Sequence, residues 1–302
     1  GEYADDGQTR FINERVHANI QKDGTYSVVP RMWGGLTTPD ELRRIADVAE
    51  KYAIPTVKVT GGQRIDLLGI KKADLPGVWA DLGMPSGHAY GKSIRTVKTC
   101  VGSEHCRFGT QQSMSMGVAL EKMLYGMGSP HKVKLAVSGC PRNCAEAGIK
   151  DVGVIGVDSG WEIYVAGNGG IKTEVAQFLC KVKTREEAME VTAAFLQLYR
   201  EEGWYLERTV HYVQRVGLDQ FDAGPIARLE HLAVAPAGAH GTALAQQTRY
   251  EVRADVAGGA EHQHPRAPIE PGGFHRQGIE WGRSRHHGGR RLASTASWCS
   301  RR

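Results

Sequence analysis

Hydrophobic and polar positions along residues 15–85 predict two strands, a helix, two more strands and a second short helix. Residues 15–36 alternate in polarity around Asp23-Gly24, a dipeptide typical of a hairpin turn. Residues 37–53 carry apolar side chains at helical spacing behind a threonine and, three positions later, a glutamate, the pattern of a capping box. Residues 55–70 alternate again on both sides of a glycine pair. This order predicts a small α+β unit.

A second α+β unit is predicted after it. Residues 111–125 have a helical pattern. Residues 131–139 alternate strictly, which predicts a strand with Lys132 and Lys134 on one face. The remaining expected elements are two strands of a meander and two helices, at residues 151–158, 161–167, 184–203 and 207–217.

The pattern becomes irregular near residue 220. Residues 221–302 contain no lysine but hold seven of the twelve histidines. A histidine-rich metal-binding tail is one interpretation, and a disordered segment or the translation of a shifted reading frame is the preferred one. The chain begins with Gly1 rather than methionine, and we expect a fragment. The expected domains are residues 1–90 and 91–220, followed by a disordered or non-native tail at 221–302.

Composition and charge narrow the classes of function. The net charge of +5 and the pI near 8.8 suit an anionic ligand as well as nucleic acid. The basic tail lacks interleaved aromatic residues, so we expect no nucleic-acid partner. The sequence contains no apolar run of the roughly 18–20 residues that a membrane span needs and no secretion signal. We therefore expect a cytoplasmic protein without a membrane partner.

The cysteines are the most informative residues. Four of the six form two pairs, spaced C-x5-C and C-x3-C, at Cys100, Cys106, Cys140 and Cys144. Disulfides, a structural zinc site and unrelated core cysteines are alternatives, but nothing marks the chain as exported and x5 is too long for usual zinc spacing. Loop-forming glycines beside both pairs favour an iron–sulfur cluster held by converging thiolates. Cys180, inside an apolar run, is expected in the core, and Cys299 belongs to the irregular tail.

Basic residues accompany the cysteine pairs. Arg95 precedes Cys100 by five positions, and Lys132 and Lys134 precede Cys140 by eight and six. Solubility alone explains many surface lysines. Several cations converging on a cluster would instead hold an anion, either a substrate oxyanion or a cofactor rich in carboxylates.

At these residues the chain resembles the sirohaem-dependent nitrite and sulfite reductase family, over residues 15–218. The family's cluster motif matches the two cysteine pairs, and the match continues through "GCPRNCAEAGIKDVGVIG". The resemblance implies a ferredoxin-like half-domain followed by a sirohaem/[4Fe-4S]-binding α+β domain. It also implies that the four cysteines hold the [4Fe-4S] cluster and that Cys144 bridges it to the sirohaem iron.

The resemblance also implies roles for five basic residues. Arg95, Lys132 and Lys134 match active-site residues of the family. Arg64 lies two positions away from the arginine of the usual T-x-R-Q pattern, and Arg31 lies near another family arginine.

Within the family, "VKVTGGQRIDLLGI" and "KTCVGSEHCRFGTQQS" are most similar to the C-terminal part of bacterial assimilatory NAD(P)H nitrite reductase large subunits. This implies a terminal reducing module that converts nitrite to ammonia in a six-electron reaction. No G-x-G-x-x-G follows a predicted strand, so FAD and NAD(P)H are expected to bind only in a part missing from this chain. A flavin module or small subunit would supply electrons. The alternatives are sulfite reduction at the same site and a non-catalytic, cluster-bearing, zinc-stabilised or anion-binding module.

Overall fold

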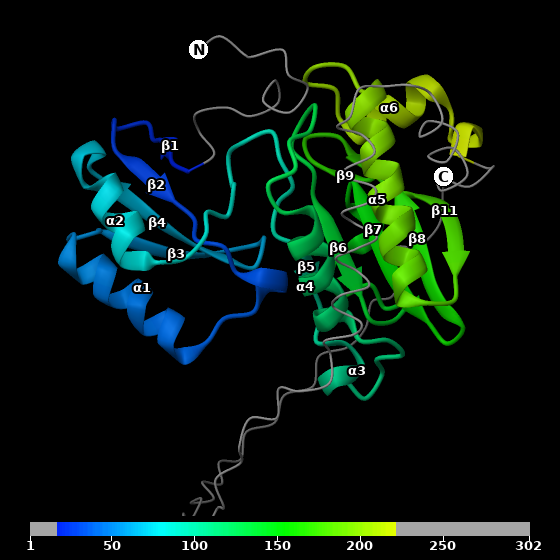
Figure 1. The fold of residues 1–302 in the computed structure, drawn as a ribbon, viewed down its shortest axis with the longest axis horizontal. Coiled ribbons are helices and arrows are strands. Elements are labelled where there is room, and N and C mark those ends of the chain that lie inside the picture. The colour runs from blue at the N-terminus through cyan, green and yellow to red at the C-terminus, as the bar shows by residue number, and fades with distance from the viewer. Residues whose placement is uncertain (1–16, 222–302) are drawn as a thin grey trace, which may run out of the picture. The chain divides into compact units, whose positions relative to one another are not determined.

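The computed structural model describes residues 17–221, and this part of the chain begins with the expected hairpin (Figure 1). Strands β1 (Asn19–Ile20) and β2 (Tyr26–Val28) pair on either side of a turn in which Gly24 has a φ of 84°. Strands β3 (Thr56–Thr60) and β4 (Arg64–Ile70) complete an antiparallel sheet in the order β1-β2-β4-β3. The predicted pair of strands around Gly61 and Gly62 is therefore confirmed.

Two helices pack against this sheet. Helix α1 (Pro39–Lys51) begins with the predicted capping box, in which Thr38 and Glu41 exchange side-chain and backbone hydrogen bonds. Helix α2 (Leu75–Leu82) follows a 3₁₀ turn, η3 (Lys72–Asp74). Another 3₁₀ turn, η2 (Trp33–Gly35), precedes α1. The buried side chains between helices and sheet are Val28, Met32, Ile45, Val48, Ile54, Leu67, Ile70, Val78, Leu82 and Met84.

The second unit is built on a five-stranded sheet in the order β11-β8-β7-β6-β5. Its strands are β5 (Lys98–Thr99), β6 (Leu135–Ser138), β7 (Val152–Val157), β8 (Gly160–Val165) and β11 (Gln177–Val182). Strands β5, β6 and β7 run parallel, whereas β8 and β11 are antiparallel to their neighbours. A separate short hairpin joins β9 (Asn168–Gly169) to β10 (Thr173–Glu174).

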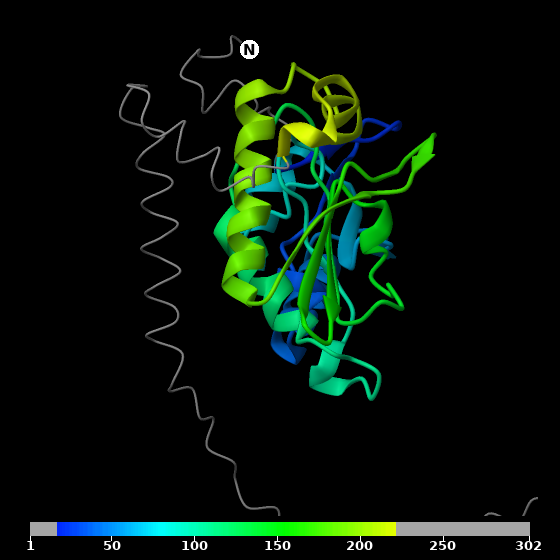
Figure 2. The ribbon, with the colours of Figure 1, turned by 90° about the vertical axis from the view of Figure 1, so that its right-hand side faces the viewer.

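The two longest helices of this unit share one face of the sheet. Helix α4 (Ser113–Leu124) contacts β5 and β6, and helix α5 (Arg185–Glu202) contacts β8 and α4 (Figure 2). They cover a core rich in valine, leucine and aromatic side chains, against which the half-buried Cys180 also packs. The shorter helical elements are α3 (Gly102–His105), η4 (Ala147–Ile149), α6 (Thr209–Val216) and η5 (Leu218–Phe221).

The strand predicted at residues 131–139 begins later than expected. Strand β6 starts at Leu135, and Val133 forms only an isolated parallel bridge with Ile94. The ladder is interrupted because the backbone N–H of Lys134 donates to the carboxylate of Asp151 (2.8 Å) instead of to a neighbouring strand. Val133 is nonetheless fully buried, so the predicted alternation holds before the regular strand begins.

A buried ion pair connects the segment after β2 with helix α4. The guanidinium of Arg31 lies 2.7 Å from Glu121 in α4, and both side chains are inaccessible to solvent. Glu121 also accepts hydrogen bonds from the backbone N–H groups of Gly34 (2.7 Å) and Val97 (3.0 Å). All described residues, from both α+β units, belong to one compact body.

Two further expectations concern the ends and the environment of the chain. The tail expected at residues 221–302 lies, apart from Phe221, outside the described residues. Among the helices of the described chain, none has the length and apolar character needed to cross a bilayer.

Candidate functional site

The two cysteine loops leave neighbouring parallel strands at the same edge of the sheet. Cys100 follows the last residue of β5, and Cys140 comes two residues after the end of β6. The two strands are in register, with Thr99 opposite Val137. Parallel strands end on the same side, so the sheet brings together two cysteine pairs that are about 40 positions apart.

Glycine allows the loops to pack closely. The backbone N–H of Gly139 donates to the sulfur of Cys100 at 3.1 Å, and its carbonyl accepts from the N–H groups of Thr110 and Gln111. A Cβ at Gly139 would lie 2.7 Å from the Gln111 carbonyl oxygen and 2.7 Å from the Gly102 Cα. Only glycine fits this crossing without moving the backbone.

The sulfur atoms differ in exposure. Cys140 is buried, Cys100 and Cys106 are half-buried, Cys144 is exposed, and all four are free thiols. Within residues 17–221, no three histidine, cysteine or acidic side chains surround a single metal position. An iron–sulfur cluster distributes its thiolates over several iron atoms, so its ligands stand farther apart. The N–H donated to Cys100 is the kind of bond that stabilises a thiolate ligand, and the donor set therefore fits a cluster.

A cavity of about 720 Å³ is lined by residues from both α+β units. Among the described residues its lining contains one carboxylate, Glu146, which forms ion pairs with Lys98 (3.1 Å) and Lys150 (2.9 Å). The lining cations are Arg64, Lys92, Arg95, Lys98, Lys132, Lys134 and Lys150. The cysteines are not part of the lining, but Lys98 and Glu146 each lie two residues from one. A pocket of this charge is suited to anions that bring several negative charges.

Arg95 and Lys92 are the most deeply buried cations of this lining, each with an exposed fraction of 7%. The side chain of Arg95 donates to the backbone carbonyl of His88 at 2.5 Å. Burial, followed by the neighbouring Arg64 and Arg31, lowers the pKa of Arg95 to about 9. An arginine with that pKa is still charged at neutral pH, and its charge is poorly compensated. An anion bound beside it would relieve this cost.

The structure places Arg64 and Arg31 in different surroundings. Arg64 lines the cavity, and its Nε and one Nη have no hydrogen-bond partner within the described part of the chain. Burial, then the charge of Arg31, lowers its pKa. Arg31 itself is not among the lining residues, because Glu121 holds its guanidinium. The arrangement brings Arg64 to the candidate site and leaves Arg31 in an interior ion pair.

Lys132 and Lys134 both line the cavity, on either side of the buried Val133. Burial lowers the pKa of both lysines. The next cause is the charge of Arg208 for Lys132, and the charge of Lys132 for Lys134. A lysine of lowered pKa releases a proton more readily at neutral pH, so the chemistry of these two groups suits both anion binding and proton donation.

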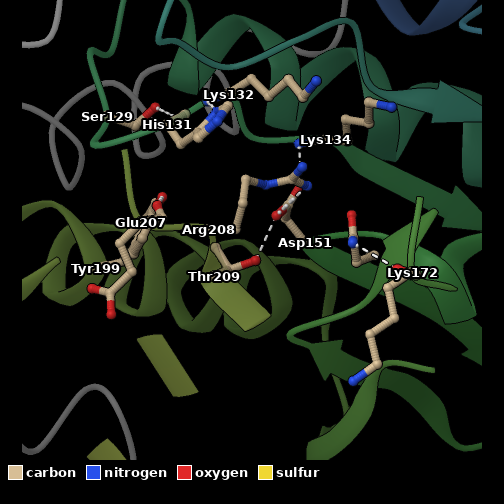
Figure 3. A network of polar contacts seen from close by, with 11 residues as sticks. Ser129, His131, Lys132, Lys134, Asp151, Lys172, Tyr199, Glu207, Arg208 and Thr209 are labelled. Carbon is tan, nitrogen blue, oxygen red and sulfur yellow. Dashed lines mark hydrogen bonds and ion pairs between the residues drawn. The ribbon is translucent and has the colours of Figure 1, made fainter. Parts of the chain in front are cut away.

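Several residues of the site carry no recognisable signal in the sequence. Figure 3 shows Asp151 beside Lys134, Arg208 and Thr209, which are brought to it from 17, 57 and 58 positions away. Such contacts follow from the folded topology and not from local spacing. Asp151, Arg208 and Thr209 lie behind the cavity wall, whereas the lining residues with polar side chains that sequence reasoning missed are Asn19, Tyr90, Lys92, Thr96, His131, Glu146 and Lys150.

Two family models match the chain. Residues 19–84 match the nitrite/sulfite reductase ferredoxin-like half domain, and residues 90–231 match the nitrite and sulphite reductase 4Fe-4S domain. The NirA protein of Mycobacterium tuberculosis, a solved structure, has the same fold, with a TM-score of 0.60 and 20% identity over 75% of this chain and 44% of that one.

Curated relatives agree. A nitrite reductase [NAD(P)H] of Bacillus subtilis is 66% identical over 72% of this chain, which spans 27% of that protein. An assimilatory-type sulfite reductase of Nitratidesulfovibrio vulgaris is 36% identical over 68% of this chain and 95% of its own length. With both domain models and a relative matched over nearly its whole length, the chain belongs to the nitrite and sulfite reductase family.

Proposed function

We propose that the chain is the terminal reducing module of an assimilatory nitrite reductase, in which nitrite undergoes six-electron reduction to ammonia. The observation that carries the proposal is the strongly cationic cavity beside two converging cysteine loops. The identity of 66% to a nitrite reductase [NAD(P)H] supports nitrite as the substrate.

Cys100, Cys106, Cys140 and Cys144 would hold a [4Fe-4S] cluster, and Cys144, the exposed member, would also bridge to the iron of sirohaem. When bound, these groups would supply the electron transfer that no side chain can provide. The cations of the cavity, with Arg64 and Lys150 at its walls, would bind the carboxylates of sirohaem.

Arg95, Lys132 and Lys134 would act on the substrate directly. Arg95 would bind and orient nitrite through its planar guanidinium, which is suited to an oxyanion. Lys132 and Lys134 would stabilise negative charge on the nitrite oxygens and donate protons to them as water leaves. Each such contact is worth roughly 3 kcal/mol of transition-state stabilisation in a site that excludes water.

Electrons would come from a flavin module or a small subunit. The chain spans 27% of the Bacillus subtilis relative, and we place the binding of FAD and NAD(P)H in a part outside this chain. This assignment makes the donor replaceable by a reduced dye.

The test is anaerobic reconstitution of the chain with iron, sulfide and sirohaem, followed by nitrite reduction with a reduced dye. We expect ammonia as the product. Cys144→Ser should abolish the magnetic coupling between the two metal centres, whereas Cys180→Ser, a control in β11, should keep it. Coupled centres in Cys144→Ser would contradict the bridging role, and a reconstituted chain that forms no ammonia would contradict the activity.

Sulfite is the second candidate substrate, because the sulfite reductase of Nitratidesulfovibrio vulgaris matches over 95% of its length. Comparing kcat/KM for the two anions on one preparation decides between them. Zinc without iron or tetrapyrrole in the purified chain would instead favour the non-catalytic alternative.

A further inference from the structure

Asp151 is a buried carboxylate that the proposed reaction does not yet use. It immediately precedes β7 and has an exposed fraction of 1%. One or both of its oxygens accept hydrogen bonds from the backbone N–H of Lys134 (2.8 Å), from the guanidinium of Arg208 (2.9 Å to each oxygen) and from the hydroxyl of Thr209. The carboxylate is therefore fully engaged by groups from two other segments of the chain.

These contacts fix the position of Lys134. Regular strand pairing begins only at Leu135, so the backbone of Lys134 is held by Asp151 through its N–H and by Val152, which donates to its carbonyl (3.3 Å). Arg208 is the N-cap residue of α6 and Thr209 is its first residue. The carboxylate thus ties α6 to the segment that carries the two lysines (Figure 3).

The carboxylate of Asp151 also compensates positive charge around Lys132 and Lys134. Lys134 is faced by the cations Lys132, Arg208 and Lys150, and by Asp151 as the opposing charge. Lys132 is faced by Arg208, Arg95 and again Asp151. Removal of the carboxylate charge would leave Arg208 uncompensated beside both lysines, and each lysine would lose its proton at a lower pH.

We propose that Asp151 is a positioning residue that ties Lys134 to the start of α6 and offsets the positive charge of Arg208 beside that lysine, so that Lys134 can bind the anion. This rests on the proposed function for the identity of the anion, but the charge of Lys134 can be measured without turnover. Asp151 does not touch the cavity itself, since it is not a lining residue, and it acts through the lysine.

The decisive variant is Asp151→Asn, which keeps an oxygen acceptor and removes the charge. Its matched control is Asp158→Asn, at the exposed turn after the same strand. The first readout is the pH dependence of amine labelling at Lys134 in the full chain, followed by mass spectrometry. We expect Asp151→Asn to move this titration to lower pH by about one unit, a tenfold change in proton affinity, and Asp158→Asn to leave it unchanged.

The second readout is the pH profile of nitrite reduction by the reconstituted chain. Asp151→Asn should raise the KM for nitrite most, by up to about tenfold, at pH values above the Lys134 labelling midpoint of the variant, and much less below that midpoint, where Lys134 is protonated again. The double variant Asp151→Asn/Arg208→Gln should return KM to within about twofold of the original, because it removes the uncompensated cation as well.

A loss of activity that is equal above and below that midpoint and is not rescued in the double variant would show a merely structural role and overturn the proposal. Labelling of Lys134 in Asp151→Asn that matches the Asp158→Asn control would overturn it too. If Asp151→Asn does not fold, Arg208→Gln alone serves, and it should move the Lys134 titration to higher pH. If the original chain reduces no nitrite, the proposed function fails while the labelling result still decides the charge relation.

Discussion

Several basic residues that line the cavity have lowered pKa values because they are buried. Arg95, Lys132 and Lys134 all have lowered pKa values, with burial as the largest cause in each case. These are the same residues that the cysteine-flanking pattern and the family resemblance pointed to. Perturbed groups that converge on one cavity are typical of functional sites, and their proposed roles as anion ligands and proton donors agree with this.

His88, which does not line the cavity, also has a lowered pKa. Its backbone has a positive φ of 46°, its ring stacks on Tyr125 at 4.9 Å between centroids, and its carbonyl accepts from Arg95. Burial, then the charge of Arg31, lowers the pKa of the His88 imidazole to about 4. The folded state therefore holds this ring neutral where the unfolded chain would protonate it.

This predicts acid sensitivity. The folded pKa of His88 lies below the unfolded value of 6.5, so its contribution is fully present above pH 6.5 and is lost as the pH falls towards 4. The free energy of unfolding should decrease by up to about 3 kcal/mol over that window. His88→Asn, which tolerates a positive φ, should flatten this limb, and the exposed His211→Asn should not. Thermal unfolding midpoints from pH 7 to pH 4 measure it, and parallel curves for both variants would refute it.

At the scale of elements, local signals predicted most helices and strands. Capping boxes at Thr38 and Thr184, together with apolar stripes, predict the helices α1 and α5. All of these signals are short-range properties of the chain. The start of β6 was missed because a carboxylate 17 positions away takes the backbone N–H of Lys134. Arg31 was expected in the active site, but its ion pair with Glu121 spans 90 positions, a contact that no local pattern reveals.

The crossing of the two cysteine loops gives a prediction for an element. In Gly139→Ala the new methyl group would meet the Gln111 carbonyl and the Gly102 Cα at 2.7 Å, and the loops must separate. We expect reduced loading of iron and sulfide per chain, with far-ultraviolet circular dichroism largely retained because the strands remain. Gly61→Ala is the matched control, since its Cβ would meet nothing within 4 Å. Equal iron content in the two variants would argue against the crossing as a requirement for cluster binding.

At the scale of the whole molecule, the Arg31–Glu121 pair couples the two units. Glu121→Ala would leave a buried guanidinium without its partner and two backbone N–H groups without their acceptor. We expect a loss of about 3–5 kcal/mol in the free energy of unfolding. The double variant Arg31→Met/Glu121→Leu removes both charges and should recover part of that loss. Denaturant unfolding of the three proteins tests this, and a double variant no more stable than Glu121→Ala would count against a charge-based cost.

The parallel pairing of β5 with β6 affects the order in which the protein folds and the cysteine pairs meet. Parallel neighbours cannot be joined by a tight turn, and here α4 lies within the crossover between them. During synthesis Cys100 and Cys106 emerge first, and they gain their partners Cys140 and Cys144 only when this crossover has folded. Non-local pairing of this kind is slow to form. On the proposed assignment, the cluster is therefore expected to assemble only after β5 and β6 have paired, and until then the early thiols are open to oxidation.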